Sequence, residues 1–432
     1  MIKLNTILIA FLIVTSVGAQ NYCELAPRFR EVVFNDVTVT SDVQYGTNVN
    51  YQRQTQDLFL DIYEPTDDNA TLRPLIIFAH GGSFIDGVKT DTDVVTFCNY
   101  YAQQGYVTVA MQYRLGWEVY NETGGKRAVF RALQDGKAVV RFLKENRATY
   151  KIDTNNIIFA GTSAGGFIGI HMAFLNEPSE IPNEIDTTEY SLTNPLGLDG
   201  LRGKTNDLYQ HSDNVKAIMN LCGAIGDTSW ITPQDEIPLL SVHGTEDGTV
   251  PYGSDVIQVE GAPIIPVSGS LDIHRRARNL GFNEEFYTFC GAGHVPYNEE
   301  DYEGDVWEPY LDTTLQFMNQ FLVENVLGCA PYVGDRIPYK DSVDCVAPKP
   351  TSVLNNEEKN WEIFPNPAKE KLYFQSTKVT ISSIEIIDLH GKLVLTSTKI
   401  NDEINIAHLP SGIYFLRVSY VNAIQVKRFV KL

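Results

Sequence analysis

The stretch that most constrains how this chain can fold is residues 161–166, Gly-Thr-Ser-Ala-Gly-Gly. A short apolar run with strand composition precedes it at 156–160, and residues 167–175 have the length and apolar density of a buried helix. A strand that turns sharply into a helix through Gly-x-Ser-x-Gly is typical of a nucleophile elbow, in which flanking glycines make room for a strained serine. The sequence therefore predicts Ser163 as a nucleophile beside the N-terminus of a helix.

Strand-like and helical segments alternate on both sides of this turn. Residues 127–147 have helical periodicity, and residues 310–326 form a second long amphipathic pattern. The strand-like runs are apolar without alternation, which is typical of strands covered on both faces. They lie at 75–79, 107–111, 156–160, 217–221, 238–242 and 285–289. This order predicts an α/β fold with a doubly wound, mostly parallel sheet.

The two ends of the chain differ from this pattern. Lys3, an apolar run at 7–14 and small residues at 17–19 predict a secretory signal peptide over residues 1–19. The catalytic domain is then expected over residues 20–330. Two segments inside it, about 176–214 and 253–269, lack periodicity and are typical of lids or binding loops.

Beyond residue 330 the composition changes twice. Residues 331–360 are rich in Pro, Lys, Asp and Asn, which predicts a linker. Residues 361–432 contain six or seven short β-prone runs separated by turn residues, which predicts a small all-β sandwich.

The net charge of the chain and the length of its apolar segments limit the classes of partner that it is expected to bind. The formal net charge of −20 argues against nucleic acid and anionic lipid as partners. No segment after the leader approaches the roughly 20 apolar residues of a spanning helix, so we expect no transmembrane segment.

The six cysteines of an exported chain are expected to form disulfides. Cys329 with Cys345 is the first predicted pair, and Cys23 with Cys98 is the second. Cys222 and Cys290 end apolar runs and are expected as buried thiols. The chain has no Cys-x-x-Cys spacing, so neither a metal site nor a redox site is predicted.

A serine nucleophile requires a histidine base and a carboxylate that orients the histidine. Both are expected in loops that follow late strands, in the order Ser, Asp/Glu, His. Asp247 follows the strand at 238–242, and His294 lies among glycines after the strand at 285–289. We predict Asp247 as the acid and His294 as the base, with Glu246 as the alternative acid.

An oxyanion hole is expected beside the serine. One N–H group would come from Ala164, the residue after the nucleophile. Residues 80–84, His-Gly-Gly-Ser-Phe, match the HGGG-type loop, so the other donors would be the backbone N–H groups of Gly82 and Ser83. His80 is expected to shape this loop and His243 to support its own turn. His171 is expected to be buried on the helix.

Taken together, these motifs resemble the serine carboxylesterase and lipase-like branch of the α/β-hydrolase superfamily over about residues 25–327. The motifs lie at 80–84, 113–115, 135–138, 161–166, 243–251 and 291–294. The resemblance implies an acyl-enzyme mechanism on a carboxylic ester, without a metal or an organic cofactor.

The tail is similar to the C-terminal sorting domain of type IX secretion. The similarity rests on residues 363–367, 388–392, 409–414 and 427–432. It implies passage through outer-membrane secretion machinery, to a secreted or cell-surface-attached location. A carbohydrate-binding β-sandwich is the competing interpretation.

The sequence thus predicts a secreted serine esterase acting on a small-molecule or polysaccharide-linked ester. Two alternatives remain open at this point. One is a prolyl-oligopeptidase-type peptidase, and the other is a non-catalytic surface binding protein on a hydrolase scaffold.

Overall fold

The computed structural model describes residues 21–259, 262–297, 310–331, 336–341, 345, 361–376, 381–388, 393–397, 403–410, 412–420 and 423–432. The predicted signal peptide and most of the predicted linker lie outside these residues. The chain divides into two compact units, Met1–Ala347 and Pro348–Leu432, and each is described by itself.

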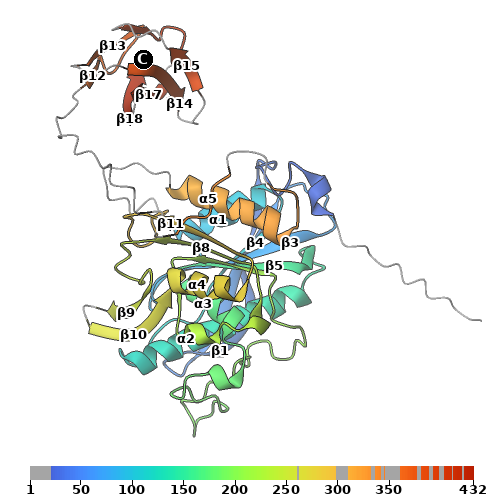
Figure 1. Cartoon of the computed structure of the whole chain (residues 1–432). Coiled ribbons are helices and arrows are strands. Elements are labelled where there is room, and N and C mark those ends of the chain that lie inside the picture. The colour runs from blue at the N-terminus through green and yellow to red at the C-terminus, as the bar shows by residue number, and fades with distance from the viewer. Residues whose placement is uncertain are drawn as a thin grey trace, which may run out of the picture. The chain divides into compact units, whose positions relative to one another are not determined.

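An eight-stranded sheet forms the centre of the first unit (Figure 1). Its strand order is β1-β2-β4-β3-β5-β6-β8-β11, with β1 and β2 antiparallel at one edge and the remaining strands parallel to one another. The predicted α/β class with a mostly parallel sheet is confirmed. The strands are β1 (Val37–Val49), β2 (Thr55–Pro65), β3 (Arg73–Ala79), β4 (Val107–Met111), β5 (Ile152–Thr162), β6 (Ala217–Leu221), β8 (Leu239–Gly244) and β11 (Glu284–Phe289).

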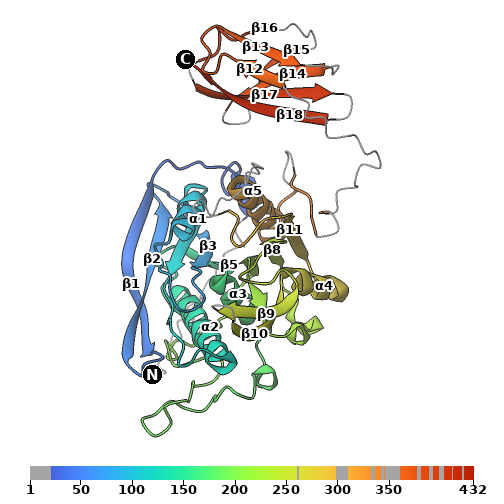
Figure 2. The same cartoon turned by 90° about the vertical axis from the view of Figure 1, so that its left-hand side faces the viewer.

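Helices cover both faces of this sheet (Figure 2). Helices α1 (Thr92–Gln103) and α5 (Tyr310–Phe321) lie on one face. Helices α2 (Glu122–Glu145), α3 (Ala164–Phe174) and α4 (Ser270–Leu280) lie on the other.

The position of β3 inside the sheet explains why its sequence is apolar without alternation. Leu75 and Ile77 pack into the core under α2 and α3, whereas Ile76 and Phe78 pack into the core under α1 and α5. Successive side chains of a strand point to opposite faces, so a strand covered on both faces needs apolar residues at every position.

The segment at 253–269, expected as an irregular insertion, contains a β-hairpin. Strand β9 (Ser254–Val259) pairs antiparallel with β10 (Ala262–Gly269), and β10 also pairs with the short β7 (Ala224–Ile225). The other insertion, 176–214, packs Ile185 and Leu198 against α2 in a small apolar cluster of its own.

The second unit consists of two antiparallel sheets, of three and four strands, around one apolar core. Its strands are β12 (Trp361–Phe364), β13 (Lys371–Ser376), β14 (Ile381–Asp388), β15 (Leu393–Ser397), β16 (Glu403–Asn405), β17 (Gly412–Tyr420) and β18 (Ala423–Lys431). The β runs predicted from the sequence correspond to these strands.

Both predicted disulfide pairings are wrong. The structure pairs Cys23 with Cys329 and Cys290 with Cys345, and it leaves Cys98 and Cys222 as buried free thiols. Cys98 does not form the predicted disulfide with Cys23 because it lies on the core-facing side of α1, fully buried among apolar residues. Cys290 was expected as a buried thiol, but it follows the end of β11 and is reached by the segment after α5.

Removing the Cys290–Cys345 bond should destabilise the first unit. The bond closes a separation of 55 residues, for which chain entropy predicts a contribution of about 4 kcal/mol to the free energy of unfolding. We expect the Cys290→Ala/Cys345→Ala variant to unfold at a lower guanidinium concentration than the parent. An unchanged midpoint and slope would contradict this expectation.

Candidate active site

Ser163 lies at the sharp turn between β5 and α3. Its backbone has φ 53° and ψ −114°, a left-handed conformation that non-glycine residues rarely adopt. The turn is too tight for side chains on its glycines: a Cβ on Gly161 would lie 2.2 Å from Gly165, and one on Gly165 would lie 2.0 Å from the carbonyl oxygen of Ala79. The glycines of the motif therefore allow the strand, the turn and the helix to meet.

The structure brings the three predicted triad residues together from distant loops. The Nε2 atom of His294 lies 2.9 Å from Oγ of Ser163, and its Nδ1 atom lies 2.6 Å from Oδ2 of Asp247. The alternative acid, Glu246, is exposed. Serine, imidazole and carboxylate thus form one hydrogen-bonded chain, the arrangement that nucleophilic acyl transfer requires.

The side chain of Asp247 is held by four hydrogen bonds and is fully buried. Its Oδ1 atom accepts bonds from the backbone N–H groups of Thr249 and Val250, both at 2.8 Å. Burial alone would raise the pKa of this carboxyl, but hydrogen bonds from His243 and His294 outweigh it and hold the pKa well below its usual range. The carboxylate therefore remains ionised and oriented toward His294.

The contact between His243 and Asp247 was missed by sequence reasoning, which expected His243 only to support its turn. Its Nε2 atom lies 3.1 Å from both Oδ2 of Asp247 and the carbonyl oxygen of Val250. Both neighbours are acceptors, so this nitrogen carries the proton, and Nδ1 accepts from the hydroxyl of Ser270 at 2.8 Å. His243 thus joins the acid of the triad to the start of α4.

A buried polar network extends from Ser270 into the sheet. Asn220 donates to Oγ of Ser270 at 3.0 Å and to Oγ of Ser241 at 2.9 Å. Ser241 in turn contacts Nε2 of His274 at 2.8 Å, and Nδ1 of His274 bonds to Glu284 at 2.5 Å. Each side chain has partners for its donors and acceptors, so the network fixes β6, β8 and α4 around the loop that carries Asp247.

The predicted oxyanion loop lies beside the serine. Gly82 and Ser83 line a cavity together with Ser163 and His294. The backbone N–H groups of Gly82, Ser83 and Ala164 make no hydrogen bond with another described residue. They are therefore available for a developing oxyanion.

The shape of the oxyanion loop is maintained by its neighbours. As expected, His80 supports the loop: Nδ1 donates to the carbonyl oxygen of Gly81 at 2.7 Å. Its ring stacks on Tyr113, whose hydroxyl donates to the carbonyl oxygens of His80 and Gly81.

Gly82→Ala should impair the oxyanion loop. Gly82 has φ +101°, and a Cβ there would lie 2.1 Å from the carbonyl oxygen of Asp86. We expect the loop to shift and kcat to fall on the order of 10²–10³-fold, the cost of losing one donor. Gly248→Ala is the matched control, because no atom lies within 4 Å of its Cβ position. Equal activity of the two variants would contradict this role.

Two cavities of different chemistry flank Ser163. One, of about 520 Å³, is lined by His294, Asp91 and Asp93 among other polar groups. The other, of about 60 Å³, is lined mainly by apolar side chains that include Trp117 and Phe167, and His294 does not reach it. The site thus has a polar side, which His294 lines, and an apolar side.

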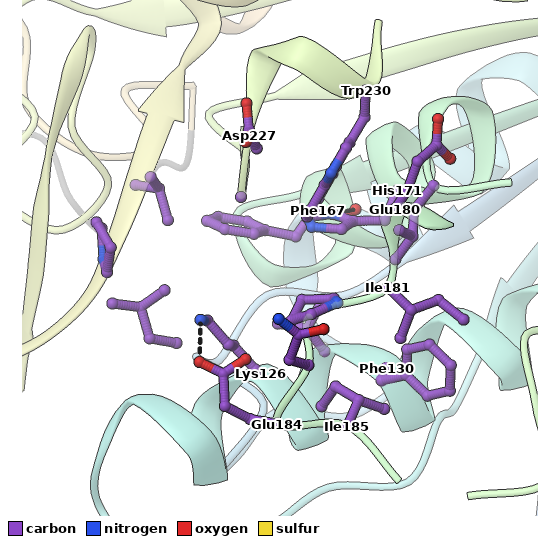
Figure 3. Close-up of a pocket in the computed structure, with 18 of the residues that line it drawn as sticks. Lys126, Phe130, Phe167, His171, Glu180, Ile181, Glu184, Ile185, Asp227 and Trp230 are labelled. Carbon is purple, nitrogen blue, oxygen red and sulfur yellow. Dashed lines mark hydrogen bonds and ion pairs between the residues drawn. The ribbon is translucent and has the colours of Figure 1, made fainter. Parts of the chain in front are cut away.

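A larger apolar cavity of about 380 Å³ adjoins the small one (Figure 3). Both are lined by Val129, Phe167 and Ile265. His171 and Trp230 also line the large cavity. Residues of the insertion at 176–214, from Ser179 to Ile185, contribute to the lining of this cavity.

The buried His171 should make stability depend on pH. Burial lowers the pKa of His171 to about 4, partly offset by the hydrogen bond that Nδ1 donates to the carbonyl oxygen of Phe167. Between pH 6.5 and pH 4 the unfolded chain therefore binds the additional proton, and stability falls as the pH falls. Relative to His171→Phe, the parent should lose about 2 kcal/mol of unfolding free energy between pH 7.5 and pH 5. Parallel urea curves at both pH values measure this; an unchanged difference would contradict it.

One group of potential metal ligands lies within the described residues: atoms of Cys222, Asp247 and His294 are all within 4.8 Å of one another. Burial raises the pKa of the Cys222 thiol well above its usual range, which favours the neutral thiol, whereas metal ligation requires the thiolate. His294 and Asp247 already bond to each other. This donor set does not fit a metal well.

Comparison with known proteins gives two family matches. Residues 60–225 match the family model BD-FAE, and residues 362–432 match the model of the secretion system C-terminal sorting domain. No helix in the described parts of the chain combines the length and the apolar character needed to cross a membrane.

Individual relatives align over shorter stretches. Carboxylesterase 3B of Mus musculus is 36% identical over 113 residues, and carboxylesterase 3 of Homo sapiens is 34% identical over 113 residues. Each alignment covers 26% of this chain and 19% of the relative, so the chain spans about a fifth of the length of these relatives. Among solved structures, esterase 2 of Thermogutta terrifontis, phosphorylated by paraoxon, is 22% identical with a TM-score of 0.46, covering 69% of this chain and 97% of that one.

The two resemblances predicted from the sequence are thereby confirmed. Residues 60–225 carry an α/β-hydrolase domain of the BD-FAE family, and residues 362–432 carry a secretion-system C-terminal sorting domain.

Proposed function

We propose that this protein is an exported serine hydrolase that cleaves carboxylic esters through an acyl-enzyme. The observation that carries the proposal is the continuous hydrogen-bonded chain from Ser163 through His294 to the buried Asp247. The triad and the available N–H groups of the oxyanion loop meet at the carboxyl ends of the parallel strands, where ligands of α/β folds bind.

The geometry supports the following sequence of steps. Oγ of Ser163 attacks the ester carbonyl carbon while Nε2 of His294 takes its proton. The backbone N–H groups of Gly82, Ser83 and Ala164 stabilise the oxyanion. The C–O bond then breaks, and His294 returns the proton to the leaving alcohol. A water molecule, deprotonated by His294, releases the acid and regenerates the serine.

The two sides of the site suggest where each half of the ester binds. Because His294 must protonate the leaving oxygen, the alcohol belongs in the polar cavity that His294 lines. The acyl group belongs in the apolar cavity lined by Ala164 and Phe167. The carboxylates of Asp91 and Asp93 favour a hydroxyl-rich alcohol, such as a polysaccharide-linked one, over an anionic alcohol.

Export is part of the proposal. The sorting domain at 362–432 and the predicted signal peptide at 1–19 support passage through outer-membrane secretion machinery, to a secreted or surface-attached location.

Assay of the purified protein on two substrate classes tests the proposed activity. We expect hydrolysis of p-nitrophenyl acetate and butyrate and no release of p-nitroaniline from proline-containing peptide anilides. Peptide cleavage without ester cleavage would favour the peptidase alternative. Inactivity on both classes, with no covalent labelling, would favour a binding protein.

A further inference from the structure

The face of α3 that begins at the nucleophile forms one wall of both apolar cavities. Ala164, Phe167 and His171 lie three or four residues apart and therefore on one side of the helix. Ala164 lines the small cavity, Phe167 lines both, and His171 lines the large one. An acyl group attached to Ser163 that follows this face therefore meets His171 at its far end.

His171 is a buried polar residue in this lining, and its hydrogen bonding is incomplete. The residue is 5% exposed. Its Nδ1 atom donates to the carbonyl oxygen of Phe167 at 2.7 Å, which is the backbone acceptor one helical turn earlier. Nε2 is therefore an acceptor in the neutral ring, and no described residue donates a hydrogen bond to it.

The surroundings keep this acceptor in place and neutral. The ring of His171 is parallel to that of Phe167, with centroids 6.0 Å apart, and meets Trp230 edge-on at 5.8 Å. The charged groups that line the cavity have partners of their own: Lys126 pairs with Glu184 at 3.2 Å, as the dashed line in Figure 3 shows. Glu180 accepts from the backbone N–H of Glu177, and Asp227 accepts from that of Ser229. Burial lowers the pKa of His171, so the ring stays uncharged near neutral pH.

We propose that the substrate's acyl group is an apolar chain ending in a hydroxyl, and that Nε2 of His171 accepts a hydrogen bond from this hydroxyl. This inference rests on the proposed function, because it assigns the acyl half of the same ester. It makes His171 a specificity-determining residue about 12 Å along the helix from Ser163, at 1.5 Å per residue. An extended chain of about eight carbons with a terminal hydroxyl spans a distance of that order.

The cost of burying an unpaired polar group determines whether the cavity prefers an acyl chain with or without a terminal hydroxyl. An apolar cavity without a polar partner would reject a terminal hydroxyl, because burying an unpaired hydroxyl is costly. A cavity with an unsatisfied acceptor has the opposite preference, because the chain without the hydroxyl leaves that acceptor unpaired. The sign of the preference therefore reports whether His171 is used.

The test compares p-nitrophenyl 8-hydroxyoctanoate with p-nitrophenyl octanoate, and uses p-nitrophenyl acetate as the substrate that does not reach the large cavity. We expect the parent to prefer the hydroxylated ester by about 10-fold in kcat/KM. His171→Phe, which keeps an aromatic ring but removes the acceptor, should prefer octanoate instead. His171→Gln, which restores an acceptor, should recover part of the original preference. Acetate hydrolysis by each variant measures its general activity, and the rates on the two longer esters are compared relative to it.

The outcomes separate this inference from the proposed function. If the parent hydrolyses acetate but prefers octanoate, or if His171→Phe keeps the parent's preference, the assignment of His171 is wrong and the esterase proposal is unaffected. If the parent hydrolyses none of the three esters, the proposed function itself fails. If His171→Phe does not fold, the parent and His171→Gln still decide through the sign of the parent's preference.

Discussion

Ser163→Ala should leave a folded protein that no longer hydrolyses p-nitrophenyl acetate or butyrate, with kcat reduced on the order of 10⁶-fold. The variant removes the one oxygen that lies within bonding distance of Nε2 of His294 among the described residues. Alanine fits the turn no worse in volume than serine, so the circular dichroism spectrum should match that of the parent. Initial rates at saturating ester measure the effect.

Ser83→Ala is the matched control for this variant. Ser83 lines both cavities that flank Ser163, but its proposed contribution is a backbone N–H group, which alanine keeps. We expect Ser83→Ala to retain activity within a few-fold of the parent. If Ser163→Ala were active and Ser83→Ala inactive, the nucleophile would be misassigned.

The second large effect concerns the acid. Asp247→Asn should lower kcat by about 10⁴-fold, because an amide cannot accept the hydrogen bond that fixes the tautomer of His294 as a carboxylate does. In this site the amide would also face three further donors, since Asp247 accepts bonds from His243 and from two backbone N–H groups. Single-turnover kinetics with p-nitrophenyl acetate would show the loss in acylation.

Glu246→Gln is the control for Asp247→Asn. The two residues are adjacent in the same loop, but Glu246 is exposed whereas Asp247 is buried against His294. We expect Glu246→Gln to behave like the parent. A large loss in Glu246→Gln with little change in Asp247→Asn would reverse the assignment of the acid.

The parts of the site that could be predicted from sequence carry local signals. The elbow at 161–166 is recognisable from its local pattern, and Gly161 is required by the backbone of Gly165 only four residues away, although Gly165 itself lies against Ala79 of β3. The buried strand β3 is apolar from Leu75 to Ala79 because both of its faces are covered. Asp247 follows β8 and His294 follows β11. Since these strands are parallel to β5, both residues lie at the same ends of the strands as Ser163.

The features that were missed depend on contacts between distant segments. Cys23 and Cys329 are 306 residues apart, and no local pattern indicates that the N-terminal turn meets the end of the α5 region. The network around His243 did leave one signal: Asn220 and Ser241 are polar residues inside otherwise apolar buried strands. Buried polar side chains require partners, so these two positions indicated a network whose other members, Ser270 and His274, only the fold reveals.

The most direct test of the account is the site of covalent modification by a fluorophosphonate. In the proposed reaction, Oγ of Ser163 attacks phosphorus and fluoride leaves, which adds one phosphonyl group to the chain. Intact-protein and peptide mass spectrometry should find a single adduct, located on Ser163, and no adduct in Asp247→Asn under conditions that label the parent fully. An adduct on another residue, or an unlabelled parent that nevertheless hydrolyses esters, would contradict the account.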